Sequence, residues 1–206
     1  IDRFHPGEGA DDTITATGLP GRHLIGCFGR VRHQKGTDLF VRAMIELLPH
    51  YPDWTAVVSG RITAENKEFA DRLKAEIAAA GLSSRIVFLG EVDDIKPWYR
   101  RLTLYVAPSR NEGFGLTPLE AMASSTATVA SDAGAYAELI AEDVTGKVVP
   151  AGDYERLRDA IQRYLAHPEE AVEAGQRGRS HVVENFALIR EATALEAVYE
   201  RLLDVN

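Results

Sequence analysis

Short apolar runs alternate with longer amphipathic segments along most of this chain. The runs have the length and composition of buried strands, and they cover residues 24–28, 55–58, 86–89, 104–107, 128–130 and 147–149. The segments between them carry apolar residues at helical spacing, and they cover residues 38–48, 65–80, 95–101, 117–124 and 135–140. Strands that alternate with helices predict an α/β protein whose parallel sheet is covered on both faces. Right-handed crossovers then make it a doubly wound, Rossmann-like sheet of the nucleotide-binding type.

The two ends of the chain differ from this alternating region. Residues 1–21 are rich in Gly, Asp, Thr and Pro, which predicts an irregular lead-in. The last third has only helical patterns, at 154–165, 169–184 and 188–203. The final helix has an apolar face that needs a partner. We therefore expect a lead-in at 1–21, a nucleotide-binding domain at 22–186 and a helical C-terminal tail at 187–206.

The overall charge is negative, so any anionic ligand must bind at a local basic site. The 31 acidic and 23 basic residues leave a formal net charge of -8, which opposes binding to nucleic acid and to anionic lipid. The single cysteine, Cys27, lies in the first apolar run, which predicts a buried, unreactive thiol and makes the cytosol the default compartment. No apolar run reaches the ~20 residues that span a bilayer. The six histidines show no metal-ligand spacing.

A basic loop follows the first predicted strand. Residues 29–36 read Gly-Arg-Val-Arg-His-Gln-Lys-Gly. Arg30 and Lys35 are suited to neutralising a diphosphate, Arg through its planar fork and Lys as a point charge. A solvated run of charge is an equally good interpretation of this loop taken alone. The chain has neither a G-x-x-x-x-G-K-S/T phosphate loop nor a G-x-G-x-x-G after a strand, which disfavours a nicotinamide-dependent dehydrogenase.

A glycine-containing segment follows the fourth predicted strand and opens a helix. Gly113 and Gly115 allow the backbone to approach a ligand closely. The exposed N–H groups at the start of the helix can bind phosphate oxygens. The carboxylate of Glu112 can accept hydrogen bonds from sugar hydroxyls. Together these features predict a site for a phosphorylated sugar ligand.

Two further glutamates, Glu120 and Glu138, can be explained by a structural role as well as by ligand binding. Residues Thr117-Pro118-Leu119-Glu120 form a capping-box pattern with proline at the first helical position, which favours a capping role for Glu120. Because a carboxylate has two oxygens, capping and ribose binding can coexist. Glu138 follows a turn of small residues after a later strand, and we expect it to face solvent.

Taken together, these motifs resemble the C-terminal domain of glycosyltransferase family 4, which has the GT-B architecture. The resemblance covers about Ile1 to Leu203 and rests on several motifs in the same order. These are Gly29-Arg30 with Lys35-Gly36, the strand end Val87-Phe88-Leu89-Gly90, and two glutamates, Glu112 and Glu120, separated by seven residues that include Gly-Phe-Gly. Two positions depart from the pattern: Ser59-Gly60-Arg61 replaces Gly-x-Gly, and Ser125-Thr126-Ala127 replaces Gly-Thr-Pro. The first departure bears on base recognition, and the second on a turn.

The resemblance implies retaining transfer from a nucleotide sugar, with no metal and no other cofactor. Arg30, Lys35 and Glu112 would be the catalytic residues, with Arg30 and Lys35 stabilising the charge on the departing nucleotide. The donor sugar would contact Glu112 and the N–H groups of Gly113, Phe114 and Gly115. The phosphates would contact the N–H groups of Leu116 and Thr117. Glu120 would bind the ribose, and the backbone at Glu91 and Val92 would meet the nucleobase.

The resemblance also bears on the whole protein. Residues 1–6 resemble the linker that enters this domain, so we expect an N-terminal domain, absent from this chain, to bind a glycan or glycolipid acceptor. The tail at 187–206 would be the helix that crosses back to that domain, and the chain alone would be inactive. The sequence is also similar to bacterial lipopolysaccharide-core mannosyltransferases, which use GDP-mannose, although a UDP-sugar fits the residues as well. We expect a cytoplasmic protein that makes at most peripheral contact with the inner face of the membrane.

Two other functions fit parts of the pattern. A nucleotide-binding module without transfer activity would keep Arg30 and Lys35 but would not need Glu112 near a sugar. A GT-B-type epimerase or phosphorylase would act on related substrates, although the chain has no evident pyridoxal-binding lysine motif. The first alternative differs from a transferase in one measurable property, namely whether the sugar adds affinity beyond that of the nucleoside diphosphate.

Overall fold

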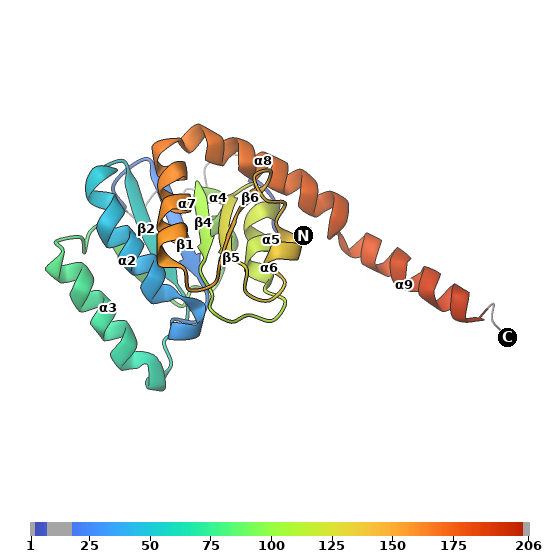
Figure 1. The fold of residues 1–206 in the computed structure, drawn as a ribbon, viewed down its shortest axis with the longest axis horizontal. Helices are drawn as coiled ribbons and strands as arrows, with labels where there is room; N and C mark the ends of the chain where they lie inside the picture. Colours follow the sequence, from blue (N-terminus) through green and yellow to red (C-terminus); the bar gives the residue numbers. More distant parts are fainter. Residues whose placement is uncertain (1–2, 8–17, 204–206) are drawn as a thin grey trace.

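The computed structural model describes residues 3–7 and 18–203, and its centre is a six-stranded, all-parallel sheet (Figure 1). The strands are β1 (His23–Phe28), β2 (Trp54–Ser59), β3 (Ile86–Gly90), β4 (Leu104–Ala107), β5 (Ala127–Ser131) and β6 (Gly146–Val149). Their order in the sheet is β3-β2-β1-β4-β5-β6. The direction of winding therefore reverses between β1 and β4, which is where ligands bind in open sheets of this kind.

Helices cover both faces of the sheet. One layer contains α2 (Thr37–Leu47), α3 (Lys67–Ala79) and α7 (Tyr154–Ala166), and it lies in front of the sheet in Figure 1. The other layer contains α4 (Lys96–Arg101), α5 (Leu116–Ala123) and α6 (Tyr136–Leu139). Side chains of β1 alternate between the two cores, with Ile25 and Cys27 in the first and Leu24 and Phe28 in the second. Burial on both faces explains why the strands are continuous apolar runs.

Two long helices end the chain. The helix α8 (Pro168–Asn185) contributes Ala171 and Ala174 to the first core and Val182 to the second, so it packs against both layers. It approaches the turn before β5 so closely that a Cβ on Gly175 would lie 2.1 Å from the Ser125 carbonyl oxygen. The helix α9 (Leu188–Leu203) then leads away from the sheet (Figure 1).

The α/β, doubly wound fold predicted from the sequence is confirmed, with each predicted strand and α-helix observed within about two residues of its expected bounds. The prediction missed three short 3₁₀ helices, η1 (His33–Lys35), η2 (Leu48–His50) and η3 (Ala64–Asn66). Within the predicted lead-in, the described residues 3–7 and 18–21 contain no helix or strand. Residues 1–2 and 8–17 of that lead-in, and 204–206 of the tail, lie outside the described residues.

Candidate functional site

Three loops meet at the carboxyl ends of β1, β4 and β5. The Arg110 N–H donates to the Gln34 carbonyl at 2.8 Å, which joins the loops after β4 and β1. The Ala135 N–H donates to the Gly113 carbonyl at 3.2 Å, which joins the loops after β5 and β4. At Gly36, which has a φ of 68°, an added Cβ would lie 1.9 Å from the Pro108 carbonyl oxygen. The loops therefore pack at a distance that only glycine allows at this position.

Lys35 and Glu112 form an ion pair where these loops meet, between Lys35 Nζ and Glu112 Oε2. The Tyr136 hydroxyl donates to the same carboxylate oxygen at 3.0 Å, and the Ser109 hydroxyl lies 3.4 Å from it. Burial by itself raises the pKa of Glu112, but the hydrogen bond and positive charge of Lys35 outweigh that effect and hold the pKa below its usual value. The Glu112 side chain is therefore an ionised acceptor at neutral pH.

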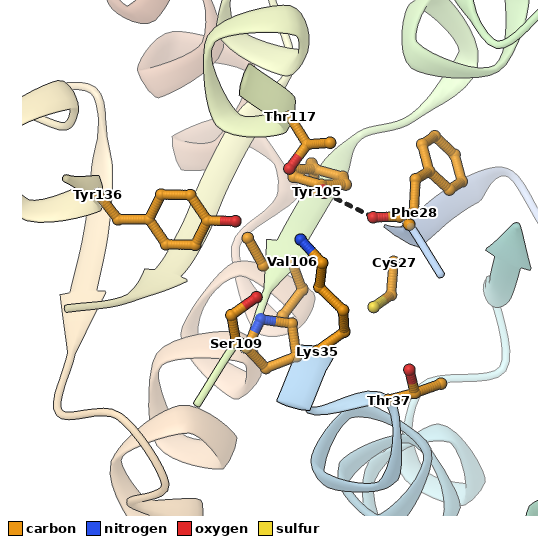
Figure 2. Close-up of a pocket in the computed structure, with 12 residues that line it drawn as sticks. Cys27, Phe28, Lys35, Thr37, Tyr105, Val106, Ser109, Thr117 and Tyr136 are labelled. Carbon is orange, nitrogen blue, oxygen red and sulfur yellow. Dashed lines mark hydrogen bonds between the residues drawn. The ribbon is translucent and has the colours of Figure 1, made fainter. Parts of the chain in front are cut away.

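A small pocket lies beside this ion pair. Figure 2 shows the Lys35 ammonium, the Tyr136 hydroxyl and the Thr117 hydroxyl directed into the same space. These groups come from η1, α6 and α5, so three separate elements supply polar atoms to one pocket. The Cys27 sulfur also lines it, but burial raises the pKa of that thiol to about 12. Cys27 therefore stays neutral, as predicted, and cannot act as a thiolate nucleophile.

The other basic side chains of the loop after β1 are less constrained. Arg30 is exposed and makes no hydrogen bond or ion pair with the part of the chain that the structure describes. Arg32, which sequence analysis did not select, has a buried Nε without a partner among residues 3–7 and 18–203. Because a guanidinium is always protonated, both side chains carry donors that no described residue uses, in the loop that also carries Lys35.

The helix α5 begins earlier than the sequence predicted, and this changes the role of Glu120. Its N-cap is Gly115, with a φ of 77°, and no side chain caps it. Pro118 is thus the third residue of the helix and not the first, and Glu120 lies too far along to reach the N-cap. The predicted capping box is therefore wrong. The first helical N–H groups, those of Leu116 and Thr117, have no acceptor within the helix.

Glu120 instead accepts a hydrogen bond from the hydroxyl of a buried tyrosine. Tyr99 on α4 donates to Glu120 Oε2 at 2.9 Å. Burial raises the pKa of the Glu120 carboxyl, and the hydrogen bond from Tyr99 offsets part of that rise. Glu138, by contrast, is exposed on α6, as expected.

The residues predicted to contact the nucleobase and the sugar lie at the same edge of the sheet, where the strands have their carboxyl ends. Glu91 is exposed directly after β3, and Val92 is half-buried against the second core. A hydrogen bond of 2.8 Å from the Gly60 N–H to the Gly90 carbonyl holds the ends of β2 and β3 together. Phe114 is 54% exposed. The structure thus brings Lys35 and Glu112 into contact, while Glu91 and Val92 lie two strands away from β1.

Sequence analysis missed three residues that hold the site together, namely Tyr99, Arg110 and Tyr136. Arg110 donates to both carboxylate oxygens of Asp38 at 2.7 Å and to the His33 carbonyl at 2.7 Å. Asp38 lies 72 positions away in the sequence, so no local pattern reveals the pair. The sequence shows that these three residues are present, but it does not show which residues their side chains contact.

Two kinds of feature are absent from the described residues. No group of three or more His, Cys, Asp or Glu side chains within them is arranged to hold a metal ion. No helix within them is long and apolar enough to cross a membrane.

This strand order, with charged loops at the reversal point, is that of a doubly wound, Rossmann-like α/β domain. Residues 12–181 match the family model described as glycosyl transferases group 1. The chain belongs to this family, and the family resemblance inferred from its motifs is confirmed.

Relatives with known names share most of this chain. It is 71% identical over 203 residues to the lipopolysaccharide core biosynthesis mannosyltransferase LpcC of Rhizobium leguminosarum bv. viciae, covering 98% of this chain and 58% of the relative. It is 47% identical over 204 residues to the corresponding mannosyltransferase LpsB of Rhizobium meliloti (strain 1021), with the same coverage. The chain therefore spans less than two thirds of the length of these relatives.

Solved structures have the same fold. The C-terminal domain of a glycosyl transferase group 1 family protein (LpcC) from Francisella tularensis superposes with a TM-score of 0.84 at 37% identity, covering 90% of this chain and 96% of that one. Anabaena HepE in complex with UDP-glucose superposes with a TM-score of 0.85 at 20% identity, covering 97% of this chain and 55% of that one. The second likeness is one of fold alone.

Proposed function

We propose that this chain is the nucleotide-sugar-binding domain of a retaining hexosyltransferase, and that the whole protein transfers mannose from GDP-mannose to a lipopolysaccharide-core acceptor. The observation that carries the proposal is the Lys35–Glu112 pair at the point where the strand order reverses, which offers a cation for phosphate and a carboxylate for sugar hydroxyls side by side. The choice of mannose and of the core acceptor is supported by the names of the two Rhizobium relatives. A UDP-sugar remains the competing donor, since HepE was solved with UDP-glucose.

In this proposal, Arg30 and Lys35 bind the diphosphate. An ammonium has three donors, and the contact of Lys35 with Glu112 uses one of them, so phosphate oxygens can bind the others. Arg30, which has no partner among the described residues, brings a second charge from the same loop. As the bond to the sugar breaks, negative charge grows on the departing phosphate. Fixed cations stabilise that charge without any metal.

The donor sugar and nucleoside bind on either side of the diphosphate. Glu112 and the N–H groups of Gly113, Phe114 and Gly115 contact the sugar, and the N–H groups of Leu116 and Thr117 contact phosphate at the start of α5. Glu120 accepts hydrogen bonds from the ribose, and the backbone at Glu91 and Val92 meets the base. The acceptor, a glycan or glycolipid, binds to a second domain, and the protein works in the cytoplasm at the inner face of the membrane.

Calorimetric titration tests the donor assignment. The chain is titrated with GDP, UDP and ADP and then with their sugar conjugates. We expect GDP to bind and mannose to increase its affinity. Equal affinity for GDP and GDP-mannose would favour a nucleotide-binding module without transfer activity. Failure of every diphosphate to bind to the full-length protein as well would refute the donor site.

A double substitution tests the phosphate assignment. In Arg30→Ala with Lys35→Ala, we expect the affinity for GDP to fall by at least about 100-fold, because each charged hydrogen bond contributes about 1.5–3 kcal/mol and the variant loses two. The affinity for guanosine should change little. Lys67→Ala is the matched control, since Lys67 also pairs with a carboxylate, that of Asp71, but on the distant helix α3. Equal losses for GDP and guanosine would show that the two residues do not bind phosphate.

A further inference from the structure

Tyr99 holds one oxygen of Glu120 and leaves the other open. Its hydroxyl donates to Glu120 Oε2 at 2.9 Å, and its side chain is fully buried. Glu120 Oε1 has no hydrogen-bond partner among the described residues, yet it is not among their buried unpartnered atoms. Oε1 is therefore accessible to solvent. The carboxylate has a fixed orientation and one free oxygen with two acceptor sites.

The tyrosine ring itself is held from several sides. Its centroid lies 5.1 Å from that of Phe28 and 5.5 Å from that of Tyr105, both in edge-on arrangements. Phe4, in the N-terminal segment 3–7, packs edge-on at 5.8 Å. The Tyr99 carbonyl accepts a hydrogen bond from the Thr126 hydroxyl at 2.7 Å. A donor fixed in this way cannot follow a moving carboxylate, so it fixes where the carboxylate lies.

An unrestrained glutamate would bind a hydroxylated ligand less well. Its side chain would lose rotamer freedom on binding, and its half-buried position disfavours the ionised form that accepts hydrogen bonds. The hydrogen bond from Tyr99 reduces both costs before any ligand arrives. Because Oε1 has two acceptor sites, it is suited to two neighbouring hydroxyls, as on a ribose.

We propose that Tyr99 is a positioning residue that, by fixing Glu120, makes the site select ribonucleoside diphosphates over those without ribose hydroxyls. The proposal rests on the proposed function, because it requires that Glu120 bind the ribose. A purely structural interpretation also exists, in which Glu120 only satisfies the buried hydroxyl of Tyr99. The two interpretations differ in what happens when the Tyr99 hydroxyl is removed. If Tyr99 positions Glu120, the preference for ligands with ribose hydroxyls falls; if its role is only structural, that preference is kept.

The chain supplies a matched control for that loss. Tyr154 on α7 donates its hydroxyl to Glu46 Oε2 on α2 at 2.5 Å, across the opposite face of the sheet. Tyr154→Phe removes the same kind of hydrogen bond as Tyr99→Phe, and both variants keep the ring. Of the two tyrosines, Tyr99 is the one whose hydroxyl bonds to the glutamate proposed to bind the ribose.

The experiment compares the dissociation constants of GDP and 2′,3′-dideoxy-GDP in the unsubstituted chain, Tyr99→Phe, Glu120→Gln and Tyr154→Phe. Their ratio is insensitive to a small unfolded fraction, because that fraction weakens both ligands equally. In the unsubstituted chain and in Tyr154→Phe, we expect GDP to bind at least about 10-fold more tightly than the dideoxy compound. The reason is that the ribose hydroxyls of GDP form hydrogen bonds with the charged Glu120 carboxylate. The preference should fall several-fold in Tyr99→Phe, through weaker GDP binding alone.

Two results would overturn the inference, and they are distinguishable. A preference that survives in Tyr99→Phe but is lost in Glu120→Gln would leave the ribose role of Glu120 intact and show that Tyr99 is only structural. A preference that survives in Glu120→Gln would refute the ribose role itself, and with it the part of the proposed function on which the inference rests.

Discussion

At the scale of single residues, Gly115 controls two parts of the site at once. Its left-handed backbone starts α5, and its Cα lies directly against the ring of Tyr136, whose hydroxyl bonds to Glu112. A Cβ at this position would lie 2.1 Å from Tyr136 Cε1. The same residue thus sets the start of a helix and the position of the tyrosine that bonds to Glu112.

We expect Gly115→Ala to lower the free energy of unfolding by more than the cost of placing an alanine in a left-handed backbone conformation, because the added Cβ also collides with Tyr136. That conformation costs a residue with a side chain about 1–2 kcal/mol. Gly152→Ala is the control, because Gly152 has a similar φ of 83° but open space around the added Cβ. Urea unfolding and GDP-mannose titration measure both variants. Only Gly115→Ala should also weaken GDP-mannose binding, and equal effects of the two variants on stability and binding would contradict this account.

The sequence predicted which residues belong to the site better than it predicted what each of them does. Lys35 and Glu112 were selected because a basic loop and a glycine-flanked carboxylate are local patterns, and they do meet in the structure. The capping interpretation of Glu120 failed because the left-handed Gly115 starts α5 before the proline. Tyr99 was missed because its function depends on a partner that only the packing of α4 against α5 reveals.

At the scale of elements, Arg110 clamps the loop after β4 to the start of α2. Its guanidinium contacts both oxygens of Asp38 and the His33 carbonyl, so one side chain fixes the two loops that carry Lys35 and Glu112. Burial by itself raises the pKa of Asp38, but the hydrogen bonds and charge of Arg110 outweigh that effect and hold the pKa below its usual value. The ionised carboxylate is thus stabilised by folding.

This clamp predicts a pH-dependent loss in Arg110→Met. A depressed pKa gives stability that is fully present above the unfolded-state pKa of about 3.9 and is lost as the pH falls through the folded value. We expect a loss of about 1–3 kcal/mol in the free energy of unfolding at pH 7, and a smaller loss at pH 3. Urea unfolding at the two pH values measures it. Arg72→Met, which removes an exposed pair with Glu76, should lose little at either pH. A loss independent of pH would show that the clamp is not electrostatic.

Elements were predicted more reliably than residue roles, for a physical reason. A strand buried on both faces is a continuous apolar run, and a covering helix repeats its apolar residues every three or four positions, so both leave a local signal. The three 3₁₀ helices are each three residues long, which is too short for any periodicity. One of them, η1, carries Lys35. The loop that matters most for the site was therefore the one whose backbone was least predictable.

At the scale of the whole molecule, exposed apolar side chains gather on α9. Leu195, Val198, Tyr199, Leu202 and Leu203 are all exposed there. The sequence predicted that this face would need a partner. The α8 helix, by contrast, buries Ala171, Ala174 and Val182 and fits Gly175 against the turn before β5. The division of the chain at residues 186 and 187 stays a prediction, and the contrast between the two helices shows how to test it.

Two truncations test that division. A chain ending at Phe186 loses the whole predicted tail, in which the described apolar side chains of α9 are exposed. We therefore expect its melting temperature to stay within a few degrees, since about 1 kcal/mol shifts a chain of this size by roughly 2–4 °C. Its affinity for GDP should also be unchanged, because no residue of the site lies beyond Tyr136. A chain ending at His167 also loses α8 and exposes both cores at β5 and β6, so we expect it not to fold cooperatively. Thermal unfolding followed by circular dichroism distinguishes the two. If removing α9 alone abolished cooperative unfolding, the helix would belong to the core of this domain, and the boundary at residues 186 and 187 would be wrong.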